Sequence, residues 1–212
     1  PSLRVLVSCR VNIAMAVSTN DDNVVLTTRI PLPNSDKEVL IIILNRPSKK
    51  NCFNTRLCHE LASIFNNVAN EVQSYDATPI HNDDDNDRQK LAVVILTGAG
   101  KSFCAGADLS SGQETFNPSF DDFAVQEDDF RRDSGGILTL RMYQFLKPIV
   151  IACNGPAVGI GASMQLAAGV RLASDQARFG FVFNNRGIVP DACSSWFLPK
   201  IIGIASALEL TY

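Results

Sequence analysis

The sequence has little histidine and tryptophan, no excess of charge of one sign and no long apolar run. It contains two histidines and one tryptophan, and its formal net charge is −3 over 212 residues. The lack of a basic excess argues against a nucleic-acid-binding protein, which needs positive charge to neutralise phosphates. No apolar stretch approaches the roughly 20 residues of a membrane-spanning helix. We therefore expect no nucleic-acid partner and no membrane span.

The cysteines and histidines also lack the spacing of metal or redox motifs. No C-x-x-C pair occurs among the six cysteines, at positions 9, 52, 58, 104, 153 and 193. We expect buried free thiols in a reducing compartment. His59 lies in a helical run and His81 in an acidic loop, and neither is near a motif. We expect no metal site and no histidine base.

Apolar runs alternate with segments of helical periodicity along the chain. Strand-length runs cover residues 39–44, 91–96, 149–153 and 170–173. Helices are predicted from Asn54 onward and over residues 137–147, 161–168 and 205–212, whereas 74–90 is expected to be a solvated loop. Alternating strands and helices indicate an α/β fold, and the unbroken runs suggest strands buried on both faces. Periodicity alone does not distinguish a doubly wound sheet from other α/β arrangements.

Two glycine-containing bends each follow an apolar strand. The first is K-S-F-C-A-G-A-D-L at 101–109, after a turn expected at Thr97-Gly98, and the second is N-G-P-A-V-G-I-G at 154–161. Gly106 permits a bend that most residues resist. Free backbone N–H groups at two such bends can together stabilise one developing negative oxygen.

These bends and three further motifs resemble the crotonase superfamily of enoyl-CoA hydratases and isomerases. The further motifs are L-N-R-P-S-K-K-N at 44–51, R-L-A-S-D-Q-A-R-F-G at 171–180 and G-I-V-P-D-A-C-S-S-W-F-L-P-K-I-I-G at 187–203. The resemblance runs from about residue 38 to the end, with weak agreement at 74–90 and 112–135. It implies a spiral of β-β-α repeats, with a C-terminal helical region that appears truncated here.

The resemblance also implies a set of substrate-binding residues. By motif position, the two oxygen-binding amides are the backbone N–H groups of Ala107 and Ile160. Many relatives have glycine at the position of Ile160. The resemblance places substrate next to these donors, at Ala105, Gly106, Asp108, Leu109 and Gly161. Lys49 stands where relatives contact coenzyme A, although a lysine pair is also common on protein surfaces. No separate cofactor is expected, because coenzyme A is part of the substrate.

Three acid positions in the family determine the reaction. The two glutamate positions of the hydratases are filled by Ser163 and Phe183, whereas a third position carries Asp191. Peroxisomal-type enoyl-CoA isomerases and dienoyl-CoA isomerases have their acid at this third position. Asp191 could also be a helix N-cap, for which aspartate is favoured.

The resemblance thus implies an isomerase that shifts a 3-enoyl-CoA double bond to the trans-2 position in fatty-acid β-oxidation. Hydratase, dienoyl-CoA isomerase and a non-catalytic acyl-CoA-binding or assembly protein stay open as alternatives. A single carboxylate can move a proton between two carbons, whereas hydration needs a second group to activate water.

The expected organisation has three parts. Residues 1–20 resemble a leader or transit segment, because they contain Arg4 and Arg10 and no acid. Residues 21–203 form the crotonase core, and 204–212 begin the truncated helical region. The resemblance further implies a homotrimer or hexamer and a peroxisomal or mitochondrial matrix location.

Overall fold

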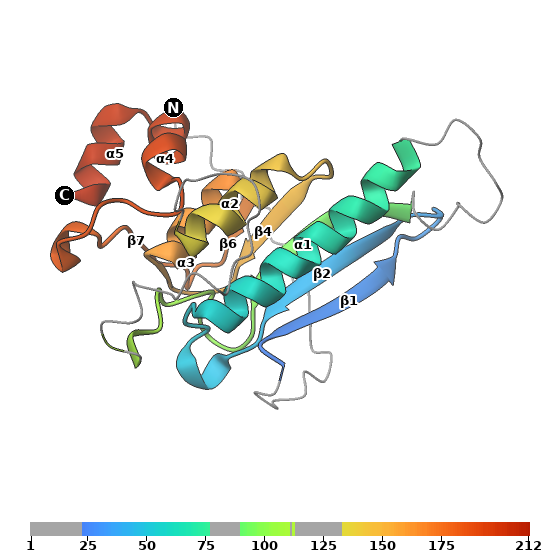
Figure 1. Ribbon diagram of the computed structural model, residues 1–212, viewed down its shortest axis with the longest axis horizontal. Helices are drawn as coiled ribbons and strands as arrows, with labels where there is room; N and C mark the ends of the chain where they lie inside the picture. Colours follow the sequence, from blue (N-terminus) through green and yellow to red (C-terminus); the bar gives the residue numbers. More distant parts are fainter. Residues whose placement is uncertain (1–22, 77–89, 111, 113–132) are drawn as a thin grey trace.

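A five-stranded sheet forms the centre of the computed structural model, which describes residues 23–76, 90–110, 112 and 133–212 (Figure 1). Its strand order is β1-β2-β3-β4-β6. The strands are β1 (Val25–Pro31), β2 (Glu38–Leu44), β3 (Leu91–Gly98), β4 (Ile149–Cys153) and β6 (Val170–Ala173). The four runs predicted as strands are all strands, and β3 continues through the predicted turn at Thr97 and Gly98. This confirms the α/β class.

The sheet is parallel apart from β1. β2, β3, β4 and β6 pair in parallel, whereas β1 pairs antiparallel with β2 at the edge of the sheet. β1 was not predicted from the sequence. From Leu26 on, its residues alternate between half-buried and exposed, as an edge strand allows. The carboxyl ends of the parallel strands lie at the same end of the sheet, and the two glycine-containing bends begin there.

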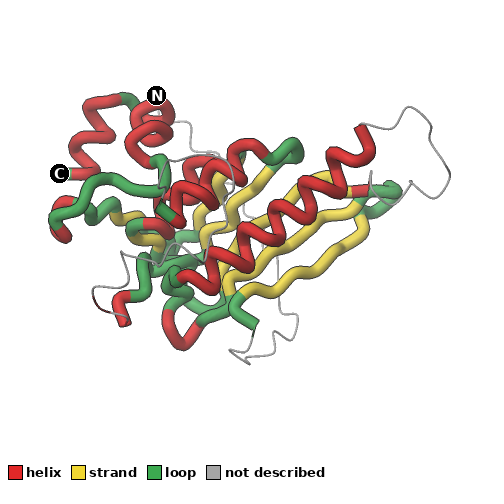
Figure 2. The backbone as a smooth tube through the Cα atoms, viewed as in Figure 1, coloured by secondary structure: helices red, strands yellow, loops and turns green. Residues whose placement is uncertain are grey.

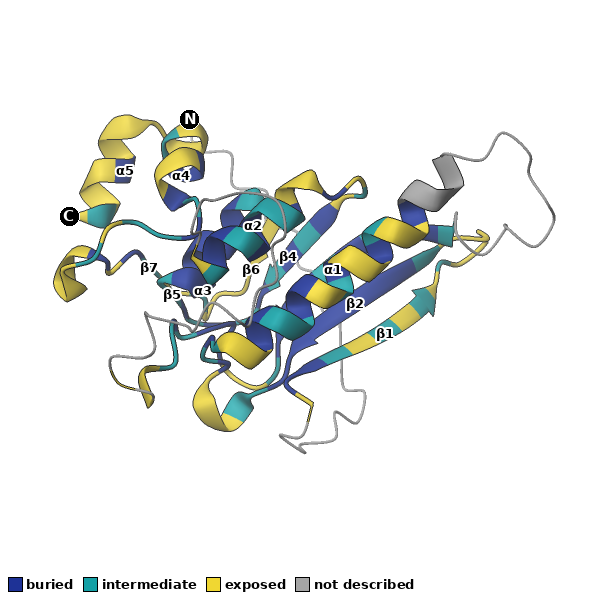
Figure 3. Ribbon diagram, in the orientation of Figure 1, coloured by how far each residue is buried: buried dark blue, intermediate teal, exposed yellow. Residues whose placement is uncertain are grey.

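β2 is buried on both faces, as its unbroken apolar run predicts (Figure 3). Leu40, Ile42 and Leu44 belong to the main core cluster. Val39, Ile41 and Ile43 form a second cluster on the opposite face. This alternation follows from the two-residue period of a strand.

Two helices, α1 (Thr55–Asp76) and α2 (Ser134–Gln144), lie on the same face of the sheet (Figure 2). Asn54 caps α1, because its Oδ1 accepts from the N–H of Leu57 at 2.9 Å. The rings of Phe65 and Phe145 pack edge to face beneath the helices, with centroids 5.6 Å apart. α1 continues to Asp76, so the loop predicted from 74 begins later, and α2 begins and ends three residues before the predicted 137–147.

Short elements follow β4 and lead to the C-terminal helices. β5 (Ala157–Val158) pairs in parallel with β7 (Phe179–Gly180) as a small second sheet. The helix predicted over 161–168 is divided into α3 (Ile160–Ser163) and a 3₁₀ helix, η5 (Met164–Ala167).

Three further helical elements complete the chain. They are η6 (Asn184–Arg186), α4 (Ser194–Ile202) and α5 (Ile204–Thr211), and α4 was not predicted. α4 and α5 lie beyond β7 and contact each other (Figure 1).

Some of the sequence predictions fall on residues outside the described ranges. The leader-like segment 1–20, most of the acidic loop 74–90 and most of the polar segment 112–135 lie there. Within the described ranges, none of the helices combines the length and apolar character needed to cross a bilayer.

Candidate active site

The first bend is anchored by the buried side chain of Asn51. Its amide nitrogen donates to the carbonyl oxygens of Ala99 at 2.9 Å and Ser102 at 2.8 Å, and its Oδ1 accepts from the N–H of Arg46 at 2.8 Å. Asn51 lies in the N-R-P-S-K-K-N motif, but sequence reasoning assigned it no role. It connects the loop after β2 to the loop after β3 and so fixes where the first bend begins.

Ala107 has a backbone N–H that points away from its neighbouring strand. Ala107 forms a parallel bridge with Phe53, in which the N–H of Phe53 donates to Gly106 and the N–H of Asp108 donates to Phe53, each at 2.8 Å. In a parallel bridge the flanking residues make the bonds, so the N–H of the central residue points to the other side. Among the described residues none accepts from the N–H of Ala107.

Ile160 has a second free N–H at the start of α3. The first N–H groups of a helix have no partner inside it. Gly159, with φ of 52°, turns the chain, and its own N–H donates to Gly180 at 2.8 Å. No described residue accepts from the N–H of Ile160.

The two bends are in direct backbone contact. The N–H of Val158 donates to the carbonyl of Cys104 at 3.0 Å. A Cβ at Gly106 would lie 3.2 Å from the carbonyl oxygen of Val158, and φ of 105° at Gly106 disfavours any other residue. The structure therefore brings the loops of Ala107 and Ile160 together.

Asp191 does not cap α4, so that interpretation of the residue is wrong. The N-cap is Cys193, which lies in the left-handed region with φ of 58° and caps no N–H with its side chain. The backbone carbonyl of Asp191 instead accepts from the N–H of Ser194 at 2.9 Å and from its hydroxyl at 2.6 Å. The Asp191 carboxyl oxygen Oδ1 is buried and has no hydrogen-bond partner in the described part of the chain.

The environment of Asp191 raises the pKa of its carboxyl to about 6. Burial is the largest cause, because it disfavours the charged form, and the negative charge of Asp133 acts in the same direction. The hydroxyl of Ser163 acts in the opposite direction. A carboxyl that titrates near the working pH can both accept and return a proton.

Sequence reasoning assigned no role to Asp133. It is the N-cap of α2, where its Oδ1 accepts from the N–H of Gly136 at 2.7 Å. The pattern Asp133-Ser134-Gly135-Gly136 before a helical run was a signal for a cap. The sequence held no signal that this cap lies near Asp191, because 58 residue positions separate the two and only the fold brings them together.

Ser163 and Phe183, at the two positions where the family resemblance implies hydratase acids, are both buried. The hydroxyl of Ser163 donates to the carbonyl of Gly159 at 3.2 Å, one turn back along the chain. Phe183 belongs to an apolar cluster that also contains Ala162 and Phe197. Neither side chain is a proton-transfer group comparable to a carboxylate.

Asp108 stabilises the first bend by two side-chain interactions. The hydroxyl of Ser110 donates to its Oδ1 at 2.7 Å, and Arg46 pairs with its Oδ2 at 2.7 Å. These contacts lower the pKa of Asp108 to about 2. The Arg46 guanidinium also donates to the carbonyl of Cys52. Asp108 is therefore held as an anion by its partners rather than placed to exchange protons.

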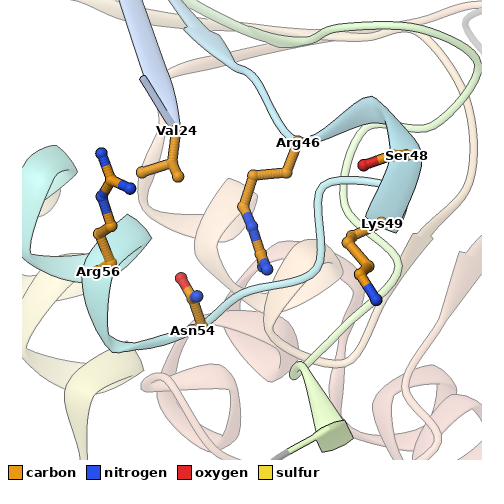
Figure 4. A pocket seen from close by; sticks show the side chains of 6 residues that line it. All are labelled: Val24, Arg46, Ser48, Lys49, Asn54 and Arg56. Carbon is orange, nitrogen blue, oxygen red and sulfur yellow. The ribbon is translucent and has the colours of Figure 1, made fainter. Parts of the chain in front are cut away.

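Lys49 lies in η1 (Pro47–Lys49) and lines a pocket of about 220 Å³ (Figure 4). The other residues lining this pocket are Val24, Arg46, Ser48, Asn54 and Arg56. Three of these side chains are cationic, which favours an anionic ligand group, although Arg46 also pairs with Asp108 and Arg56 with Glu60. The pocket includes none of Ala107, Ile160 and Asp191, but the Arg46–Asp108 ion pair connects it to the first bend.

The remaining predicted site residues surround the bends. The N–H of Ala105 donates to the carbonyl of Lys50 at 3.0 Å, so Ala105 joins the loop of Lys49 to the first bend. Leu109 is 46% exposed and ends the bend at the surface. Gly161 packs against Cys104, with no room for a side chain.

A model of a known protein family matches more than half of this chain. Residues 81–212 match the family model described as enoyl-CoA hydratase/isomerase. The first bend, the second bend and Asp191 all fall inside the matched range. The match therefore covers the proposed site but not the loop that contains Lys49.

Individual relatives are similar at about 30% identity. Enoyl-CoA hydratase ACTT3 of Alternaria alternata is 32% identical over 86% of this chain and 53% of its own length. The 1,2-epoxyphenylacetyl-CoA isomerase of Escherichia coli (strain K12) is 31% identical over 84% of this chain and 60% of its own. This chain thus spans a little over half the length of the curated relatives it matches.

A solved structure supports the fold. The enoyl-CoA hydratase/isomerase from Pseudoalteromonas atlantica T6c superimposes with a TM-score of 0.59 at 31% identity. The alignment covers 87% of this chain and 61% of that one. The crotonase-type α/β fold expected from the sequence is therefore confirmed.

Proposed function

Because the chain belongs to the enoyl-CoA hydratase/isomerase family, we propose that it moves the double bond of a 3-enoyl-CoA thioester to the trans-2 position. The observation that carries this proposal is the Asp191 carboxyl, whose Oδ1 is buried with no hydrogen-bond partner among the described residues and whose pKa is raised to about 6. It lies near α3, whose first residue presents one of the two free amides. A single proton carrier beside an oxygen site suits a double-bond shift.

The proposed mechanism uses one carboxylate in two steps. Ionised Asp191 removes a proton from C2 of the substrate, and the electron pair delocalises into the thioester carbonyl as a dienolate. The N–H groups of Ala107 and Ile160 donate to the resulting oxyanion. Asp191 then returns its proton to C4, so the double bond between C3 and C4 is replaced by one between C2 and C3. No proton or water is consumed.

The two amide donors account for the stabilisation of the intermediate. Loss of one such donor lowers kcat by about 10²–10³ in enzymes with comparable oxyanion sites, or about 3–4 kcal/mol. The donors are backbone groups, so the isoleucine side chain at position 160 does not remove one. The start of α3 adds partial positive charge near Ile160.

Ser163 and Phe183, which stand at the positions of the hydratase acids, favour isomerisation over hydration. Water addition needs one group to activate water and another to protonate carbon. The hydroxyl of Ser163 donates a hydrogen bond to the carbonyl of Gly159, and Phe183 is buried among apolar side chains. Neither provides the second acid–base group at its position, which supports a proton shuttle by Asp191 alone.

The cationic pocket beside Lys49 supports a thioester of coenzyme A as the substrate. Arg46, Lys49 and Arg56 line it, and phosphate groups are ligands that such side chains bind well. We propose that the phosphates of coenzyme A contact Lys49. The acyl end would then extend along the first bend, past Asp108, to the amide of Ala107.

A side-by-side assay tests the proposal. Purified full-length protein is given 3-enoyl-CoA, 2-enoyl-CoA and 3,5-dienoyl-CoA, and product formation is followed separately for each. We expect 3-enoyl-CoA isomerisation to exceed hydration greatly and to be lost in Asp191→Asn. Hydration that survives Asp191→Asn would overturn the proposal. Binding of acyl-CoA without turnover, unchanged in Asp191→Asn, would instead indicate a non-catalytic acyl-CoA-binding protein.

A further inference from the structure

Three chain segments meet around Gly135 at the N-terminus of α2. A Cβ placed at Gly135 would lie 2.6 Å from Cδ1 of Ile160, 3.0 Å from Oδ1 of Asp133 and 3.1 Å from Cβ of Ala192. Gly135 is therefore the point where Asp133, Ile160 and Ala192, the neighbour of Asp191, meet. A side chain at position 135 would therefore force the end of the Ile160 side chain to move.

The Asp133 carboxylate cannot swing freely away from this point. Its Oδ1 accepts from the N–H of Gly136 at 2.7 Å, as the N-cap of an 11-residue helix. An N-cap bond fixes the side-chain torsion, and the positive end of a helix favours negative charge at this position. A fixed negative charge is thus held beside the segment that carries Asp191.

We propose that Asp133 is a positioning residue for the reaction, whose cap-locked carboxylate stabilises the protonated form of Asp191 after it has taken the substrate proton. This inference rests on the proposed function for its role in turnover, but not for the interaction itself. Asp133 does not exchange protons with the substrate. It acts on Asp191 through its charge.

The groups that face Asp191 support a role for this charge. Asp133, the N-cap of α2, raises the pKa of the Asp191 carboxyl, and Ser163 of α3 lowers it. On α4 the basic residue is Lys200, which lies in the last turn over the ring of Trp196 and is not among the groups that shift the pKa of Asp191. In the described part of the chain, Asp133 is therefore the charged group acting on Asp191.

The proposal differs in a measurable way from a purely structural cap. Asparagine and serine cap helices about as well as aspartate, so Asp133→Asn and Asp133→Ser keep the cap and remove the charge. A structural cap predicts no change in the titration of Asp191 in either variant. A charge effect predicts that the midpoint falls by about half a pH unit or more, because a like charge has been removed.

The titration is measured by NMR on protein labelled with ¹³C at the aspartate carboxyls, with the Asp191 signal identified by its absence in Asp191→Asn. Asp36→Asn is the matched control, because Asp36 is exposed at the turn before β2, at the opposite edge of the sheet. We expect a lower midpoint for Asp191 in both Asp133 variants and no change in Asp36→Asn. An unchanged midpoint in a folded Asp133→Asn or Asp133→Ser protein overturns the inference.

Salt and kinetics give two further outcomes. Raising salt from about 0.05 M to about 0.5 M shortens the screening length, so it should lower the Asp191 midpoint in the wild type and much less in Asp133→Asn. The acid limb of kcat/KM for 3-enoyl-CoA should shift with the midpoint, and neutral-pH kcat should fall severalfold. A wild type without isomerase activity whose midpoint still shifts would reject the proposed function while this inference stands.

Discussion

The backbone N–H of Val158 donates to the backbone carbonyl of Cys104 at 3.0 Å, and this bond joins the two loops that carry the free amides. Ala107 lies three residues after Cys104, and Ile160 lies two residues after Val158. Neither amide depends on its own side chain for its position. The geometry of the oxygen site therefore depends on close backbone packing, in which glycine at a few positions is essential.

Gly161→Ala should damage this packing. A Cβ at Gly161 would lie within 2.8 Å of Cβ of Cys104 and closer still to its carbonyl oxygen, so the loops must separate. We expect a loss of about 1–3 kcal/mol in the free energy of unfolding, measured by urea denaturation, and a lower kcat. Gly169→Ala is the control, because a Cβ at that exposed position meets no atom within 4 Å. Equal stability of the two variants would contradict the packing argument.

Ala107→Pro should abolish most turnover. Proline has no N–H, so the substitution removes one of the two proposed donors, and kcat should fall by about 10²–10³. Ala107→Ser and Ile160→Gly keep the N–H groups and should lose far less. Circular dichroism and thermal melting check that the proline variant is folded. Near wild-type kcat in a folded Ala107→Pro protein would rule out this donor.

Asp191→Asn should stabilise the protein at neutral pH while abolishing activity. The pKa of Asp191 is about 6 in the folded protein and near 4 in an unfolded chain. Folding therefore becomes less favourable as pH rises from about 4 to 6, and this cost persists at pH 7. Removing the charge should recover on the order of 2 kcal/mol. Melting temperatures of the wild type and Asp191→Asn at pH 4 and pH 7 measure this gain in stability, which should appear at pH 7 and vanish at pH 4.

Asp108 should contribute stability with the opposite pH dependence. Its pKa is lowered to about 2 by Ser110 and Arg46, so its contribution is present above about pH 4 and is lost as pH falls toward 2. We expect Asp108→Asn to lose about 1–2 kcal/mol at pH 7, with a reduced dependence of stability on pH between 4 and 2. Denaturant midpoints across this range measure it. Parallel pH profiles for wild type and variant would show that the ion pair does not stabilise the bend.

Much of the fold follows from local patterns in the sequence. The apolar runs at 39–44, 91–96, 149–153 and 170–173 each become strands of the central sheet. An unbroken apolar run can only be satisfied by burial on both faces, and this requirement does not depend on the rest of the chain. β1 was missed because an edge strand has half of its residues in solvent and lacks such a run.

The start of a helix was harder to predict than its existence. α2 begins at Ser134 because Asp133 caps it, and two glycines in the first turn hid the helical periodicity. The helix predicted over 161–168 changes to a 3₁₀ helix at Met164, in a segment that contacts α2. Such boundaries depend on tertiary contacts that no local pattern contains.

The amino-acid sequence by itself determined the four parallel strands of the central sheet, the two glycine-containing bends, the positions of Ala107 and Ile160, and the replacement of two acids by Ser163 and Phe183. Only the tertiary structure decided that Oδ1 of Asp191 is buried and does not cap α4, and that Asp133 meets Ala192, the neighbour of Asp191, at Gly135. The physical reason is range. Backbone conformation and strand burial are set by neighbouring residues, whereas the protonation of Asp191 depends on desolvation and on a charge from a distant part of the chain.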